Sequence, residues 1–338
     1  MKNFKNLKDT ALLEKQDREA LEPDKACVFG IKPLDEALIS LDKNDLVVIG
    51  ADSGGGKSEV ALRMARVNAK MGRRVALYSL EGGSIQAMRR MKWQDICENY
   101  YANYHEMGVD MDYRKWSKNK DRNGLISEIE QEVIDNKYDA YKDNLMFFCG
   151  STLSLDDLLH SLLDFHDVHG EFISTKKASK FNLDLIIIDH LQYFSLTKDE
   201  SEISEITEIL KSVKRITEEY AIPVVLISHM RKKSKDRGLP GQEDFHGSSN
   251  IPKIASVAIT ISSASDNADL KNMIYPTYIR VVKSRMGISP LFAFLINFDG
   301  RQKKYMDNYQ IFRVNSQGFV PDKPLDKAEF PDWAQGAI

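Results

Sequence analysis

The sequence lacks the features of zinc-binding, secreted and membrane-spanning proteins. Its 338 residues contain three cysteines, Cys27, Cys97 and Cys149, which lie far apart and without metal-ligand spacing. A zinc module is therefore excluded, and a reducing, cytoplasmic setting is expected. No apolar run reaches the roughly 18 residues that a transmembrane helix needs, so no membrane partner is expected. The first residues mix lysine with acidic residues, unlike a signal peptide or an acid-poor transit peptide.

Charge and composition narrow the class of protein further. The formal net charge of −3 argues against a chain coated in nucleic acid, although it is compatible with a local basic channel. Apolar residues make up 42% and charged residues 29% of the chain, which is ordinary for a globular protein. The length suffices for one large α/β domain or two small ones.

Apolar runs alternate with amphipathic stretches from Phe29 onward, which predicts an α/β fold with a mostly parallel, doubly wound central sheet. Strands are expected near residues 45–50, 74–80, 145–149, 184–189, 223–228, 256–262, 277–283 and 291–297. The last strands follow one another without a helix between them, which predicts a C-terminal β-meander. Residues 1–28 are expected to form a linker or arm, residues 29–314 the main domain, and residues 315–338 a loosely ordered tail.

A glycine-rich segment is the most informative motif of the chain. Residues 50–58 read GADSGGGKS, between an apolar run and a helical pattern. Backbone N–H groups in such a turn, together with the positive end of the following helix, form a cradle for phosphate. Lys57 would reach the β and γ phosphates, and the Ser58 hydroxyl would bind Mg²⁺. Ala51 replaces the first glycine of the usual motif, which requires a negative φ there. The predicted cradle consists of Asp52, Ser53, Gly54, Gly55, Gly56, Lys57 and Ser58.

Three other predicted strands end in polar residues at the same edge of the sheet. The apolar run 185–188 predicts a strand buried on both faces, and Asp189 at its end lies where open α/β sheets bind ligands. Asp189 is therefore expected to help hold Mg²⁺. Glu81 follows another strand and is a candidate to orient the attacking water; a capping carboxylate is the alternative. His229 ends a third strand and can sense the γ phosphate by donating a hydrogen bond; a structural histidine is the alternative.

These strand ends and their order resemble the RecA-fold motor domain of the DnaB-type hexameric replicative helicases, in detail the phage helicase–primase and Twinkle branch. The segment GIKPLDEAL (30–38) is similar to the one that precedes the motor in those proteins. SGGGKS, YSLEGG, IIIDHLQYF and ISHMRKK follow in the family order, and then DFHGSSNIPKIASVAITI (244–261) and RVVKSRMG (280–287). The likeness covers about residues 29–300. Residues 1–28 show no likeness to a primase, zinc-ribbon or helicase N-terminal domain.

The resemblance implies roles for individual residues. It implies that His229 senses the γ phosphate, and that Arg285, together with Lys283, reaches into the neighbouring subunit's site as an arginine finger. Surface ion pairs at a strand end are the alternative for these two cations. The residues implied to bind and hydrolyse ATP with Mg²⁺ are Lys57, Ser58, Glu81 and Asp189.

A basic run follows His229 and is a candidate DNA contact. Its five cations are Arg231, Lys232, Lys233, Lys235 and Arg237. The run contains no aromatic residue, so it would bind backbone phosphates rather than stack bases. A solvated loop is the alternative.

The leading hypothesis for function is an ATP-dependent, ring-forming DNA helicase or translocase that acts on single-stranded DNA in replication. Its homo-oligomer would be a hexameric ring, with other replication proteins as further partners, in the cytoplasm of a bacterial or phage-infected cell. A RadA- or KaiC-like RecA-fold ATPase that switches assembly in DNA repair or regulation, without unwinding, is the alternative. A nucleotide-binding structural or loader subunit with little catalysis is a third possibility.

Overall fold

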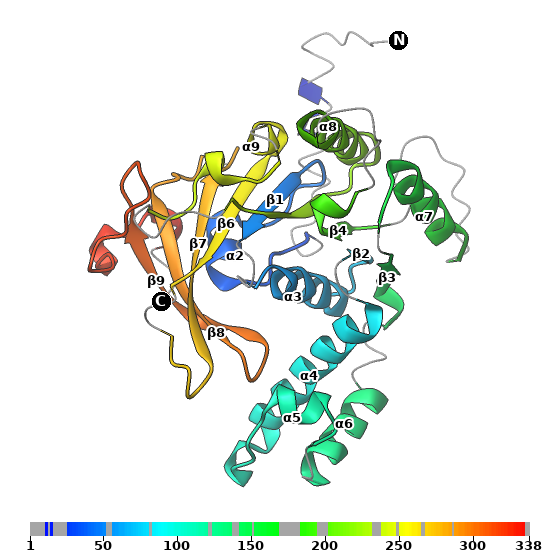
Figure 1. Cartoon of the computed structure of the whole chain (residues 1–338), viewed down its shortest axis with the longest axis vertical. Helices are drawn as coiled ribbons and strands as arrows, with labels where there is room; N and C mark the ends of the chain where they lie inside the picture. The colour runs from blue at the N-terminus through cyan, green and yellow to red at the C-terminus, as the bar shows by residue number, and fades with distance from the viewer. Residues whose placement is uncertain are drawn as a thin grey trace.

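The computed structural model describes residues 11–12, 14–15, 26–51, 56–80, 83–120, 124–136, 142–150, 152–168, 183–194, 202–231, 238–247, 250–264, 268–285 and 287–334. A nine-stranded sheet has the order β3-β2-β4-β5-β1-β6-β7-β8-β9 (Figure 1). The strands are β1 (Leu46–Ala51), β2 (Val75–Ser79), β3 (Leu145–Cys149), β4 (Leu185–Asp189), β5 (Val224–His229), β6 (Val257–Ser263), β7 (Ile274–Lys283), β8 (Phe292–Asp299) and β9 (Lys304–Arg313). The α-helices are α2 (Lys32–Leu38), α3 (Lys57–Lys70), α4 (Ser84–Asn103), α5 (Tyr113–Ser117), α6 (Gly124–Asn136), α7 (Leu155–Val168), α8 (Glu202–Tyr220) and α9 (Ile251–Ile254). Short 3₁₀ helices are η2 (His105–Met107), η3 (Lys142–Asn144), η4 (Leu191–Tyr193), η5 (Gln242–Asp244), η7 (Lys327–Glu329) and η8 (Asp332–Ala334).

The sheet has a parallel part and an antiparallel part, as the sequence predicts. Strands β1 to β6 pair in parallel, with β1 between β5 and β6. Strands β7, β8 and β9 continue the sheet as an antiparallel meander. Each predicted strand is present, with ends shifted by a few residues. Strand β9 was not predicted, because exposed polar residues interrupt its buried positions, so the segment shows neither a continuous apolar run nor a strict alternation.

Helices cover both faces of the parallel part. Along β1, Val47 and Ile49 join a core cluster with α2 and α3, whereas Leu46 and Val48 join a second cluster with α8. This alternation follows from the two-residue period of a strand, and it requires apolar residues at every position of β1. The doubly wound α/β architecture is therefore confirmed.

Helices α4, α5 and α6 form a lobe beyond the sheet (Figure 1). The lobe has its own apolar core around the fully buried Trp93. Two of its side chains fasten it to the turn between β8 and β9: Trp93 Nε1 donates to the carbonyl of Arg301 at 2.6 Å, and Gln94 Nε2 donates to the carbonyl of Lys303 at 2.6 Å. The lobe is thus held beside the sheet by directed hydrogen bonds.

The expectation of a loosely ordered tail after residue 314 is wrong for residues 315–334. Phe330 and Ala334 are buried in the main core, and Trp333 packs against Phe294. The backbone N–H of Leu325 donates to the carbonyl of Ile311 on β9. The segment lacks periodicity because isolated side chains, rather than one face of a helix or strand, anchor it.

Two of the three cysteines, Cys27 and Cys97, are buried free thiols.

Among the described residues, no helix combines the length and apolar character that a membrane crossing requires.

Candidate active site

The glycine-rich motif lies between β1 and α3, as predicted. Ala51, at the position of the usual first glycine, is the buried last residue of β1 and is not among the described residues with positive φ. Gly56 precedes α3 with φ of +83°, and a Cβ on it would lie 2.8 Å from Tyr305 Oη. Glycine is therefore required at position 56 both by the backbone and by packing. Asp52, Ser53, Gly54 and Gly55 lie outside the described residues.

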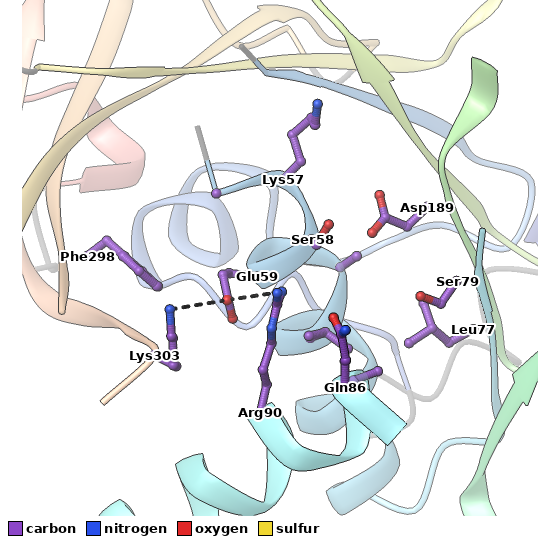
Figure 2. Close-up of a pocket in the computed structure, with 14 residues that line it drawn as sticks. Lys57, Ser58, Glu59, Leu77, Ser79, Gln86, Arg90, Asp189, Phe298 and Lys303 are labelled. Atoms are coloured by element: carbon purple, nitrogen blue, oxygen red, sulfur yellow. Dashed lines mark ion pairs between the residues drawn. The ribbon is translucent and has the colours of Figure 1, made fainter. Parts of the chain in front are cut away.

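The motif's last two residues open α3 and face the sheet edge. The buried Lys57 places Nζ 2.6 Å from His229 Nδ1. Ser58 of α3 and Asp189 of β4 both line the same cleft and lie near each other there (Figure 2). Asp189, the last residue of β4, lies opposite Ser79, the last residue of β2, and His229 ends β5. The ends of β2, β4 and β5 therefore lie close to the N-terminus of α3. Asp189 and His229 thus lie at the carboxyl edge of the parallel sheet, where the sequence predicts them.

A cleft of about 480 Å³ is present at this edge. Its lining includes Gly56, Lys57, Ser58, Glu59, Ser79, Gln86, Arg90, Asp189, Phe298 and Lys303. The hydroxyl of Ser58 and the carboxylate of Asp189 are the hard oxygen donors that Mg²⁺ prefers. Among the described residues, no group of three or more His, Cys, Asp or Glu side chains could hold a metal ion. The Ser58 hydroxyl and the Asp189 carboxylate fit a Mg²⁺ that would complete its shell with water and phosphate oxygens.

One wall of the cleft was missed by sequence reasoning. Glu59 in the first turn of α3 pairs with Arg90 of α4 at 3.3 Å and with Lys303 of the β8–β9 turn at 4.0 Å (Figure 2). Burial raises the pKa of Glu59, and the two cations oppose this rise. Phe298 of β8 adds an apolar surface to the same wall. No local pattern marks Arg90, Lys303 or Phe298, because only the packing of α4 and the meander on α3 brings them here.

The histidine at the end of β5 is held from several sides. The ring of His229 lies 3.9 Å, centroid to centroid, from that of His190, which is fully buried. Burial, and then the nearby His229 and Lys57, lower the pKa of His190 to about 3, so its ring is neutral at physiological pH. The lysine ammonium has only donors, so Nδ1 of His229 must accept its hydrogen bond. A neutral His229 then carries its proton on Nε2.

The comparison with protein families decides where the chain belongs. The model of the family described as "DnaB-like helicase C terminal domain" matches residues 28–307. The chain is a member of this family. The predicted resemblance to DnaB-type helicases is thereby confirmed, while placement in the helicase–primase and Twinkle branch stays a prediction.

Relatives and solved structures agree with this membership. A protein of Chlamydia trachomatis serovar L2 named "Probable plasmid replicative DNA helicase" is 24% identical over 82% of this chain and 53% of its own length. The "Replicative DNA helicase DnaC" of Bacillus subtilis is 24% identical over 75% of this chain and 52% of its own length. The chain thus spans about half the length of the curated relatives it matches.

Two solved structures share the fold. One is an ATPase domain with a TM-score of 0.67 at 16% identity, and the match covers 90% of this chain and 99% of that one. The other, a DnaB-like replicative helicase solved in a study of its interactions with primase, has a TM-score of 0.66 at 16% identity, with 90% and 67% covered.

The two cations of the Lys-x-Arg element in this DnaB-like chain lie apart from the cleft. Lys283 Nζ donates to three carbonyls, those of Pro252 at 2.6 Å, Lys253 at 2.9 Å and Ala255 at 2.7 Å, at the end of α9. Desolvation, and then the charge of Arg285, lower the pKa of Lys283. Arg285 is exposed. Neither residue lines the cleft of its own chain.

Of the predicted DNA-contacting residues, one is described. Arg231 is exposed, and its backbone N–H donates to the carbonyl of Asp244 at 2.7 Å. Four residues of the basic run lie outside the described residues, namely Lys232, Lys233, Lys235 and Arg237. Glu81, the candidate that orients water, also lies outside them. Their roles remain predictions.

Proposed function

We propose that this chain is the ATP-hydrolysing motor of a ring-forming helicase or translocase that moves on single-stranded DNA. One observation carries the proposal: four predicted site residues converge on one cleft region at the carboxyl edge of the sheet, namely Lys57, Ser58, Asp189 and His229. Membership of the DnaB-like family supports this function over a RadA- or KaiC-like assembly switch.

In the proposed reaction, Lys57 and the N–H groups at the start of α3 stabilise negative charge on the β and γ phosphate oxygens. Ser58 and Asp189 would hold Mg²⁺, which would supply positive charge to the phosphoryl oxygens. Glu81 orients the attacking water. His229 accepts from Lys57 through Nδ1 at 2.6 Å, so a triphosphate would compete with His229 for the lysine.

The neighbouring subunit completes the proposed site. Arg285 is exposed and does not line the cleft of its own chain, which is the disposition that a residue acting in trans requires. An arginine finger supplied by a neighbour stabilises transition-state charge and is worth about 10³ or more in rate. Because Lys283 already donates to three carbonyls, we assign it the support of this segment rather than direct contact.

The basic run is the proposed DNA contact. It begins at Arg231, two residues after His229, so the phosphate-sensing strand leads directly into it. Contacts from its cations to the phosphate backbone would be independent of base sequence and would weaken with salt. A hexameric ring would line a central channel with these runs.

The test measures ATP hydrolysis with and without single-stranded DNA, and strand separation on a forked duplex. Lys57→Ala should lower the DNA-stimulated kcat at least about a hundredfold and abolish unwinding, because it removes a charge that stabilises the transition state. Lys323→Ala, a change of an exposed lysine that does not line the cleft, serves as the matched control.

Three outcomes separate the candidate functions. DNA-stimulated hydrolysis with unwinding supports the helicase. Hydrolysis and DNA binding without strand separation would support the assembly switch instead. A parent protein whose ATPase ignores single-stranded DNA at low and moderate salt alike would overturn the proposal.

A further inference from the structure

Strands β4 and β5 separate where the cleft begins. Their register runs through Ile186↔Val224 and Ile187↔Val225 and ends at Ile188↔Leu226. Beyond that point, β4 continues next to β2, where Asp189 lies opposite Ser79, and β5 continues next to β1, where His229 lies opposite Ala51. The backbone ladder therefore does not connect the proposed metal ligand to the proposed phosphate sensor.

The side chain of Gln192 spans this opening. It lies on η4, directly after β4, and its Oε1 accepts the backbone N–H of His229 at 3.3 Å. Its Nε2 donates to Ser228 Oγ at 3.0 Å. Ser228, fully buried, in turn donates to the carbonyl of His229 at 3.3 Å, which also accepts the N–H of His246 at 3.0 Å. The amide of Gln192 thus takes the place of the backbone hydrogen bonds that β4 and β5 no longer make beyond Ile188↔Leu226.

The turn that carries Gln192 is itself anchored. Leu191 and Phe194 are buried in the core, and His190 packs its ring on that of His229. The turn therefore contacts His229 in two ways. The amide of Gln192 holds its backbone, and the ring of His190 packs on its imidazole. Since the half-buried amide of Gln192 has a partner at both its oxygen and its nitrogen, it has few alternative conformations, and this contact restricts where the imidazole can lie.

We propose that Gln192 is a positioning residue that sets the orientation of His229 relative to Lys57, and thereby couples the metal-binding strand to the phosphate-sensing strand. The inference rests on the proposed ATPase function. Gln192 acts through His229 and has no direct role in the chemistry. Its effect must therefore depend on the presence of the histidine side chain.

The first experiment is a double-mutant cycle in the full chain. Gln192→Leu should lower the DNA-stimulated kcat about tenfold and change KM for ATP less than about twofold, because a positioning hydrogen bond is lost while binding groups remain. In a His229→Ala background, the same change should have little further effect. Ser228→Ala, which leaves the bond from His229 to Gln192 intact, should have a smaller effect in the same direction.

The matched control is Thr217→Val. Thr217 is fully buried on α8, and its Oγ1 donates to the carbonyl of Asn44, which precedes β1 at the opposite edge of the sheet. This variant should lower Tm without changing kcat. If Gln192→Leu fails to fold, Gln192→Glu keeps an acceptor for the N–H of His229 and should retain more kcat than Gln192→Ala.

A second measurement is independent of activity. The chain has seven histidines, and ¹⁵N-histidine NMR, with His229→Ala for assignment, reports the ring tautomer. We expect His229 to show mainly the Nε2–H form in the parent and a mixture in Gln192→Leu. The role of Gln192 would be overturned if Gln192→Leu left the His229 tautomer unchanged, or if it lowered kcat equally in the parent and in the His229→Ala background. Either result would leave the proposed ATPase function untouched. A parent without ATP hydrolysis would instead overturn the proposed function.

Discussion

At the scale of single residues, Gly56 shows how strongly one position can be determined. Its φ of +83° favours glycine, and Tyr305, almost fully buried, closes the space in which a Cβ would lie. The tyrosine comes from β9, a strand that the sequence did not predict, and its hydroxyl lies next to Gly56. The space available at Gly56 thus depends on the C-terminal meander.

Gly56→Ala should weaken nucleotide binding more than about tenfold, because left-handed backbone strain of about 1–2 kcal/mol adds to the overlap with Tyr305 Oη. Titration with a fluorescent ATP analogue measures this loss. Gly72→Ala is the matched control, since Gly72 has φ of +80° but a Cβ there would meet nothing within 4 Å. It should lower stability with unchanged affinity. If Gly56→Ala bound the ATP analogue as tightly as the parent does, glycine would not be required at position 56.

At the scale of elements, the joint between α3 and α4 connects the phosphate-binding helix to the lobe. Arg66 of α3, almost fully buried, reaches the fully buried Asp95 at 2.6 Å and also pairs with Glu98. Lys70 adds a bond to Glu98 at 3.0 Å. Removing one member of such a network leaves buried charge uncompensated, so the joint behaves as a unit.

The joint predicts a pH dependence. Burial opposes the charge of Glu98, but Arg66 and Lys70 outweigh it and lower its pKa from 4.5 to about 2. A lowered acid pKa contributes stability above pH 4.5 that is lost as pH falls toward 2. Because about a third of the side chain is exposed, screening reduces the expected contribution to about 1–2 kcal/mol.

Urea unfolding of the parent and Glu98→Gln checks this expectation. The difference in free energy of unfolding should be largest at pH 7 and should shrink steadily below pH 4.5. Glu106→Gln, a change of an exposed glutamate in the same lobe, should show no such trend. A difference for Glu98→Gln that stays constant down to pH 3 would exclude the ion network as its source.

At the scale of the whole molecule, the residue proposed as the arginine finger lies outside the cleft of its own subunit. Lys57 faces the cleft, whereas Arg285 is exposed outside it, and Lys283 supports the end of α9. If neighbours share sites, activity is a property of the interface between two subunits.

Mixing inactive variants tests this sharing. Lys57→Ala and Arg285→Ala should each lack DNA-stimulated hydrolysis, but a mixture should recover part of it. The reason is that a Lys57→Ala subunit still supplies Arg285 to the intact cleft of its Arg285→Ala neighbour. The double variant mixed with Arg285→Ala should recover nothing, because neither partner then has a finger. Failure of the first mixture at every ratio, with assembly intact, would refute a shared site.

Much of the fold and part of the site followed from local patterns. Continuous apolar runs predicted β1, β4 and β5, because strands buried on both faces exclude polar residues. Parallel strands end at one edge, so the positions of Asp189 and His229 relative to Lys57 could be predicted without coordinates.

The remaining features depend on contacts between segments distant in the sequence. Polar residues interrupt the buried positions of edge strand β9 and of the packed residues 315–334. Neither segment therefore shows a continuous apolar pattern in the sequence. Arg90 and Lys303 enter the cleft through the docking of α4 and the β8–β9 turn on α3. Gln192 connects to His229 because β4 and β5 diverge there. Periodicity in the sequence determined which segments are strands and helices and what chemistry their ends carry. Tertiary packing alone decided which side chains from separate elements surround that chemistry, because each such contact is a property of two surfaces at once.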